Sequence, residues 1–159
     1  KENEVFYKDN FKIPSMDLVD LNNSVDVFIE TKNFKKGEVA VSGSYPKLAV
    51  MPSEDHVIDN VNFAMQCHQK VRDRIGLAFR ILSWYRNEEL NRKVGGAKNS
   101  DHKTGLANDT TTSGNNREIA KRIQGMNFPF IDKIIYYKKQ NFFHISYSRE
   151  KGRNLYWEA

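Results

Sequence analysis

Hydrophobic residues between positions 56 and 75 recur at spacings of three and four, which is the period of one face of an amphipathic helix. The positions on this face are Val57, Val61, Ala64, His68, Val71 and Ile75. Ser53 is placed to cap the helix, because acidic residues follow it in the first turn, and Gly76 is placed to end it. The pattern therefore predicts a long helix over about 56–75 with a buried apolar face.

After this helix, short apolar runs mix with short amphipathic stretches. The predicted elements are a strand at 78–83, helices at 87–94 and roughly 115–126, and strands at 133–137 and 142–147. The last two strands flank a short polar turn, which indicates a hairpin. Because helices and mostly antiparallel strands mix without regular βαβ units, the predicted fold class is α+β, with a central antiparallel sheet flanked by helices.

The first 50 residues have a different pattern. Short β-prone runs at 25–29 and 39–41 are broken by Asn-Asn, Lys-Gly and Ser-Gly pairs, and the segment contains no histidine. We therefore expect a β-rich N-terminal extension over 1–50 and a separate domain over 51–159. The extension carries no chemical motif, so its role stays open.

Composition narrows the chemistry that the chain can perform. The 159 residues are 39% hydrophobic and 28% charged, which is ordinary for one globular domain. The longest apolar runs are far too short to span a bilayer. A lone Cys67 excludes an intramolecular disulfide, so any metal site has to be built from histidines and carboxylates.

The net charge of +5 allows an acidic partner, either nucleic acid or an anionic polymer such as a cell wall. Lysines and arginines are scattered along the chain, however, and no zinc-finger, RNP or helix-turn-helix pattern accompanies them. No nucleic acid is therefore expected as a partner.

His102 and Asp109 are the residues most suited to binding a metal. They stand seven apart, an odd separation that puts side chains on opposite faces of a straight strand. A turn has to intervene if both bind one ion, and Gly105 is placed to make it. His144 in the last predicted strand is the candidate third ligand. Two histidines and one aspartate leave the fourth zinc position open, as catalytic sites do.

The segment around these residues resembles the zinc D-Ala-D-Ala carboxypeptidases and L-alanyl-D-glutamate endolysins. The matching positions are Ser100, His102, Gly105, Ala107 and Asp109, then Phe142, His144 and Ser146. Upstream, the run from Ser83 to Asn91, with Arg86 inside it, is similar to the Ser-Gly-Tyr-Arg-Ser-x-Glu-Leu-Asn segment of the family. The resemblance covers about residues 55–150 in the order of the family.

This resemblance implies an α+β domain with a zinc ion on its central sheet, held by His102, Asp109 and His144. Arg86 matches the family arginine that lies near the carbonyl or carboxylate of the substrate, a role that suits a charged fork of donors. Ser100 is expected to support the site by hydrogen bonding. The implied function is a zinc-dependent metallopeptidase that cuts peptidoglycan stem peptides, at either D-Ala-D-Ala or L-Ala-D-Glu.

Two positions depart from the family pattern. Many members have Glu or Asp three residues before the last histidine, where it serves as general base, and this chain has Asn141 there. An amide cannot take that proton and could only position water. Other relatives have Glu at the end of the preceding strand, where Tyr137 stands as a possible acid or oxyanion donor. We therefore assign Tyr137 and Asn141, with Ser100, to substrate binding.

The departure at Asn141 leaves a second function open, a non-catalytic phage structural or cell-wall-binding protein that retains the peptidase fold. The first residues, Lys1 to Glu4, lack the apolar region of a signal peptide. The expected place of action is the bacterial cell wall, reached by lysis from inside, by delivery with a virion, or by export with a leader that has been trimmed.

Overall fold

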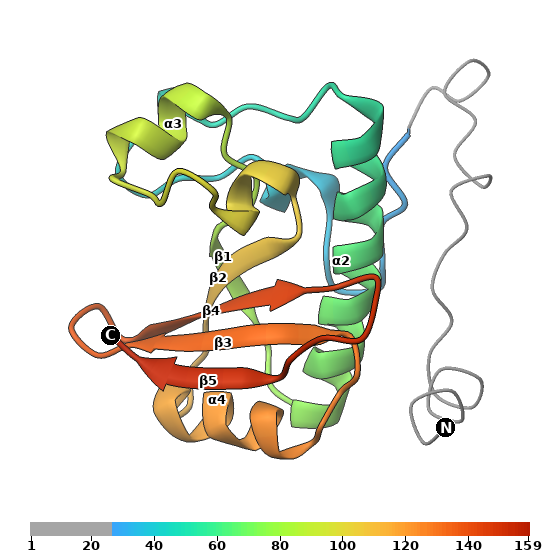
Figure 1. Cartoon of the computed structure of the whole chain (residues 1–159), viewed down its shortest axis with the longest axis vertical. Helices are drawn as coiled ribbons and strands as arrows, with labels where there is room; N and C mark the ends of the chain where they lie inside the picture. The colour runs from blue at the N-terminus through green and yellow to red at the C-terminus, as the bar shows by residue number, and fades with distance from the viewer. Residues whose placement is uncertain (1–26) are drawn as a thin grey trace.

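The computed structural model describes residues 27–159, in which five strands form one sheet in the order β1-β2-β4-β3-β5 (Figure 1). The strands are β1 (Arg80–Ser83), β2 (Ala107–Thr111), β3 (Ile131–Tyr137), β4 (Phe142–Tyr147) and β5 (Leu155–Glu158). All neighbours are antiparallel except β3 and β5. The predicted α+β class and the β3–β4 hairpin are confirmed, whereas β5 was not predicted.

Helix α2 (Asp55–Ile75) confirms the predicted long helix, and Gly76 ends it with a left-handed φ of 78°. The cap was predicted wrongly: Glu54 occupies the N-cap position and makes no side-chain cap bond. Helix α4 (Asn116–Gly125) begins at a true cap, because the side chain of Asn115 accepts a hydrogen bond from the Glu118 backbone N–H.

Helices α2 and α4 contact each other. Helix α4 packs on strands β3 and β4, and α2 packs on β4. The core that they share with the sheet includes Val61, Ala64, Ile123, Ile134, Phe143 and Ile145. Since side chains alternate along a strand, the neighbouring positions of β3 and β4 face away from the helices. The functional residues described below come from this second face of the sheet.

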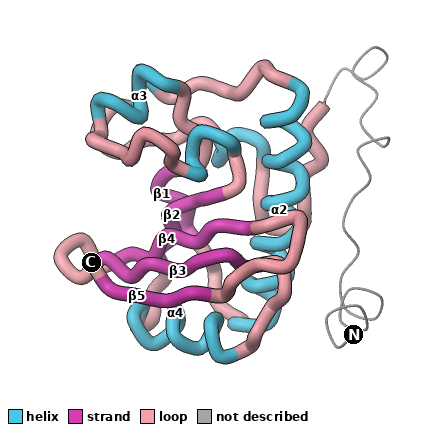
Figure 2. The backbone as a smooth tube through the Cα atoms, in the orientation of Figure 1, coloured by secondary structure: helices cyan, strands magenta, loops and turns pink. Residues whose placement is uncertain are grey.

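The chain between β1 and β2 is mostly loop, with the short helix α3 (Glu88–Lys93) and the 3-10 helix η4 (Asp101–Thr104) within it (Figure 2). Asn87 caps α3 through a bond from the Leu90 backbone N–H. None of the helices within residues 27–159 combines the length and the apolar character that a bilayer span requires.

Residues 27–50 are not β-rich, so that part of the prediction is wrong. They contain the 3-10 helices η2 (Lys36–Val39) and η3 (Pro46–Leu48), and a single bridge joins Ser42 to Ser83. The β-prone run at 39–41 begins inside η2, at whose start the Glu38 side chain accepts from the Lys35 backbone N–H at 2.9 Å.

The described part of the N-terminal segment packs on the rest of the molecule. Phe34 and Val39 are fully buried and belong to the same core cluster as α2. The predicted run at 25–29 lies partly outside the described residues, and the division of the chain at residue 50 stays a prediction.

Candidate active site

The sheet register brings together two side chains that are 35 residues apart in sequence. Asp109 of β2 lies opposite His144 of β4, and Ser83 of β1 lies on the other side of Asp109. His102 reaches the same point from η4. Gly105 ends η4 with a φ of 82°, and a Cβ there would come within 2.7 Å of Val61 Cγ2 on α2. The predicted turn at Gly105 is therefore confirmed, and close packing against α2 also excludes a larger residue.

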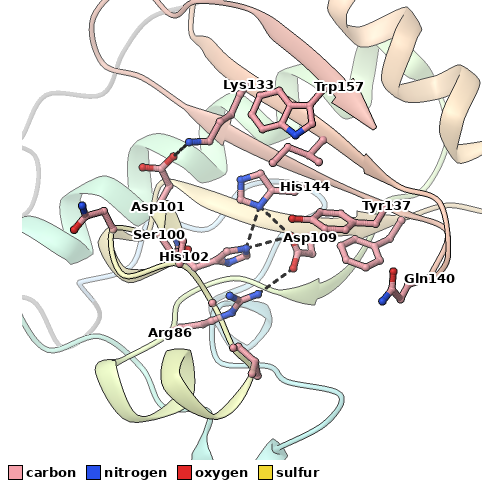
Figure 3. Close-up of a pocket in the computed structure, with 17 residues that line it drawn as sticks. Arg86, Ser100, Asp101, His102, Asp109, Lys133, Tyr137, Gln140, His144 and Trp157 are labelled. Atoms are coloured by element: carbon pink, nitrogen blue, oxygen red, sulfur yellow. Dashed lines mark hydrogen bonds and ion pairs between the residues drawn. The ribbon is translucent and has the colours of Figure 1, made fainter. Parts of the chain in front are cut away.

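Three potential ligand atoms converge at this point (Figure 3). His102 Nε2 lies 3.1 Å from Asp109 Oδ1 and 3.2 Å from His144 Nδ1, and His144 Nδ1 lies 3.2 Å from Asp109 Oδ1. All three side chains are buried. Within residues 27–159, this is the one group of histidines, cysteines and carboxylates placed to hold a metal ion.

The hydrogen bond of His102 to Trp84 leaves a lone pair of His102 pointing at the centre of this group. His102 Nδ1 lies 2.6 Å from the carbonyl oxygen of Trp84, which can only accept, so Nδ1 carries the proton and neutral His102 has a lone pair on Nε2. His144 Nε2 is buried without a partner among the described residues, so this ring interacts through Nδ1. Two ring nitrogens and a carboxylate oxygen that face one another fit a bound cation.

The electrostatics of the group favour the forms that bind metals. Burial would raise the pKa of the Asp109 carboxyl, but its electrostatic interactions and hydrogen bonds with His102 and His144 hold that pKa well below its usual range. Burial lowers the pKa of His144, against the opposing effect of Asp109. Asp109 is therefore ionised and His144 neutral near pH 7, which are the states in which a carboxylate and an imidazole act as ligands.

Arg86 holds the second oxygen of Asp109. Its Nη2 donates to Asp109 Oδ2 at 3.2 Å, its Nε to Ser83 Oγ at 3.1 Å, and its Nη1 to Asn91 Oδ1 at 3.4 Å. The backbone N–H of Arg86 also donates to the carbonyl oxygen of His102. Asp109 thus presents Oδ1 to the histidines, while Arg86 fixes the direction of the carboxylate.

A cavity of about 460 Å³ opens over the group. The residues predicted at the site that line it are Arg86, Ser100, His102, Asp109, Tyr137 and His144. Ser100 Oγ accepts from the His102 backbone N–H at 3.2 Å, so Ser100 caps the turn that carries His102. Burial raises the pKa of Tyr137, and the charge of Asp109 raises it further, so its hydroxyl keeps its proton.

Asn141 is absent from the lining of this cavity. Its Oδ1 accepts from the Tyr136 hydroxyl at 2.8 Å, and its carbonyl oxygen accepts from Asn116 of α4. Gln140, its neighbour in the hairpin turn, lines the cavity instead. The structure therefore separates Asn141 from the residues with which the sequence grouped it.

Sequence reasoning missed several side chains that line the cavity, among them Asp101, Lys133 and Trp157. Lys133 of β3 forms an ion pair with Asp101 of η4 at 3.0 Å, next to His102 in the chain. Trp157 of β5 also lines the cavity, on the same side as Lys133 (Figure 3). The apolar residues at 155 and 157 of the short run Leu-Tyr-Trp-Glu are a weak period-two signal that could have indicated this strand.

Comparison with protein-family models matches residues 32–146, more than two thirds of the chain, to the family described as peptidase M15. The chain belongs to the peptidase M15 family. The resemblance found in the sequence is thereby confirmed, and it assigns the protein to the peptidoglycan peptidases. The match contains all three candidate ligands and Arg86, whereas β5 with Trp157 lies beyond it. A search of curated proteins found no match.

Proposed function

We propose that this peptidase M15 protein is a zinc-dependent hydrolase of peptidoglycan stem peptides, of the D,D-carboxypeptidase or endolysin type, from a bacterium or a phage. The observation that carries the proposal is the convergence of His102 Nε2, Asp109 Oδ1 and His144 Nδ1 at the floor of a cavity. Two histidines and one carboxylate are the ligand set of catalytic zinc sites that keep one position open.

The side chains around the three ligands have distinct roles in this proposal. A zinc ion in such a site supplies Lewis acidity, which polarises a peptide carbonyl and makes water a stronger acid. Arg86 uses three of its five N–H groups on Ser83, Asn91 and Asp109, so two remain for a carbonyl or carboxylate of the substrate. The protonated hydroxyl of Tyr137 can donate to the same substrate group.

The general base is the part of the mechanism that the cavity does not supply at the expected place. Among the described residues that line it, the carboxylates are Asp101 and Asp109. Asp101 is paired with Lys133, and Asp109 is held by Arg86 and the histidines. This observation favours a second candidate function, a non-catalytic phage structural or wall-binding protein that keeps the fold and the metal.

Metal analysis tests zinc binding, which both proposed functions share. The purified protein is expected to hold about one zinc per chain, and His102→Ala is expected to lose it. His56→Ala is the matched control, because His56 is an exposed histidine that forms an ion pair with Glu54. Wild-type protein that binds no zinc would contradict both functions.

Digestion of purified peptidoglycan separates the two functions. The peptidase is expected to release stem-peptide fragments that mass spectrometry assigns to one bond, with zinc present and several wall chemistries supplied. His102→Ala should release none. If zinc-loaded wild type cuts no stem-peptide bond but sediments with the wall, the binding function is correct and the peptidase function is wrong.

A further inference from the structure

Trp157 lies in register with the candidate metal ligands across the sheet. Asp109 pairs with His144, His144 pairs with Ile135, and Ile135 pairs with Trp157. Residues that face one another across neighbouring strands present their side chains on the same face. These four residues therefore form one straight row, which runs from the ligands to the edge strand β5.

The spacing of the strands gives the distance along this row. Neighbouring strands lie about 4.8 Å apart, so Trp157 stands about 10 Å from His144 along the row. An extended peptide advances about 3.3 Å per residue, so roughly three residues cover that distance. Ile135 is the side chain between them, and it lines the same cavity as His144 and Trp157, so the row lies along one cleft.

Trp157 is exposed on the cavity side while its strand is fixed from the other side. Its side chain is 42% exposed and lines the cavity, whereas Trp84 is fully buried. Glu158, which faces the opposite way, is bound by Arg117 of α4 and by the Tyr156 hydroxyl. Backbone bonds of Ala159 with Lys138 and Tyr136 secure the strand beyond it. The indole is thus presented on a fixed platform at the edge of the cleft (Figure 3).

We propose that Trp157 is a substrate-binding residue that packs against the stem peptide about three residues from the bond that is cut. This inference rests on the proposed function, which it deepens by naming the length of substrate that the cleft recognises. An indole suits this position because it offers a large apolar face and one N–H donor to a peptide that stays partly in water. The site then prefers peptides long enough to reach from the ligands to β5.

The kinetic test compares Trp157→Ala with a matched control on the same strand. Leu155 alternates with Trp157 on the same face and is 39% exposed, but it does not line the cavity. With a synthetic stem pentapeptide, Trp157→Ala is expected to raise KM about tenfold with kcat within about twofold. With a dipeptide that holds only the scissile bond, Trp157→Ala should match wild type. Leu155→Ala should have the KM and kcat of wild type on both peptides. The pentapeptide KM of Trp157→Phe should lie between those of wild type and Trp157→Ala.

Binding followed by tryptophan fluorescence gives a readout that does not need turnover. The pentapeptide is expected to shift the emission of wild type, because Trp157 is the exposed tryptophan, and to leave that of Trp157→Phe unchanged. If Trp157→Ala and Leu155→Ala have the same pentapeptide KM, or if Trp157→Ala loses activity equally on the dipeptide, the inference is overturned. If wild type cuts no peptide, the proposed function fails, and an absent emission shift then overturns the role of Trp157 separately.

Discussion

One hydrogen bond joins His102 to Trp84, and a second joins Trp84 to Gly105 at the end of the turn that carries His102. His102 Nδ1 donates to the Trp84 carbonyl oxygen at 2.6 Å, and Trp84 Nε1 donates to the carbonyl oxygen of Gly105 at 3.0 Å. Trp84 itself is fully buried. The backbone of this residue therefore sets the tautomer of His102, and its side chain fixes the end of η4.

Replacement of Trp84 by Phe keeps the carbonyl and most of the ring but removes the indole N–H. We expect zinc affinity to fall about tenfold, because the turn that positions His102 loosens, and the free energy of unfolding to fall by about 1–3 kcal/mol. Competition with a chelator and urea denaturation measure the two effects. Phe128→Leu is the control: it also disturbs a buried ring, and it should lower stability while zinc affinity stays within about twofold. Equal losses of zinc affinity in Trp84→Phe and Phe128→Leu would contradict a specific role of the Trp84 indole in positioning His102.

Arg86→Lys tests whether the fork of the guanidinium matters or only its charge. The lysine cannot reach Ser83, Asn91 and Asp109 at once, so kcat/KM on a stem peptide is expected to fall about 100-fold while zinc content stays near one per chain. Arg92→Lys on α3 is the control, since Arg92 is exposed and lies outside the lining of the cavity. Full activity in Arg86→Lys would show that a single positive charge is enough.

The buried imidazole of His68 leads us to expect a pH dependence of stability that is independent of the candidate metal site. Burial lowers the pKa of His68 from 6.5 to about 3. Thr110 Oγ1 donates to Asn108, so it accepts from His68 Nε2, and His68 Nδ1 accepts from the Tyr147 hydroxyl. The folded protein therefore stabilises the neutral form of the His68 imidazole.

His68 is protonated below about pH 6.5 in the unfolded chain but stays neutral in the folded chain. The free energy of unfolding therefore falls as the pH is lowered from about 6.5 towards 3. The contribution of neutral His68 to the free energy of unfolding is fully present above pH 6.5 and amounts to at most roughly 4–5 kcal/mol. Urea denaturation between pH 8 and 4 should show a shallower loss for His68→Gln than for wild type. His56→Gln, at an exposed histidine, should keep the slope of wild type. Parallel slopes for wild type and His68→Gln would contradict the assignment.

Asn141→Asp is expected to leave hydrolysis within about twofold of wild type. The side chain at this position bonds to the Tyr136 hydroxyl outside the lining of the cavity, and a carboxylate there would keep that partner. Initial rates on a stem pentapeptide measure the effect, with Gln140→Glu as a companion because Gln140 does line the cavity. A tenfold gain in Asn141→Asp would show instead that the lost base was the missing element.

Local rules were sufficient to predict much of this protein from its sequence. The spacing of apolar residues predicted α2, since a helix repeats every 3.6 residues, and two β-prone runs around a polar turn predicted the β3–β4 hairpin. The seven-residue interval from His102 to Asp109 demanded a turn, and Gly105 provides it with its positive φ. These features depend on neighbours in the chain, which the sequence shows directly.

Only the tertiary structure decided which distant residues share the cleft. The pairing of β3 with the four-residue strand β5 is parallel and non-local, so neither a turn nor a long periodic run in the sequence predicts it. This pairing nevertheless places Trp157 in line with His144. Asn141 is the last residue of the hairpin turn, with a φ of 57°, and its side chain bonds to the Tyr136 hydroxyl outside the lining of the cavity. Register and side-chain direction arise from long-range pairing and packing, and for that reason the sequence pointed to the three residues that converge but not to the cleft around them.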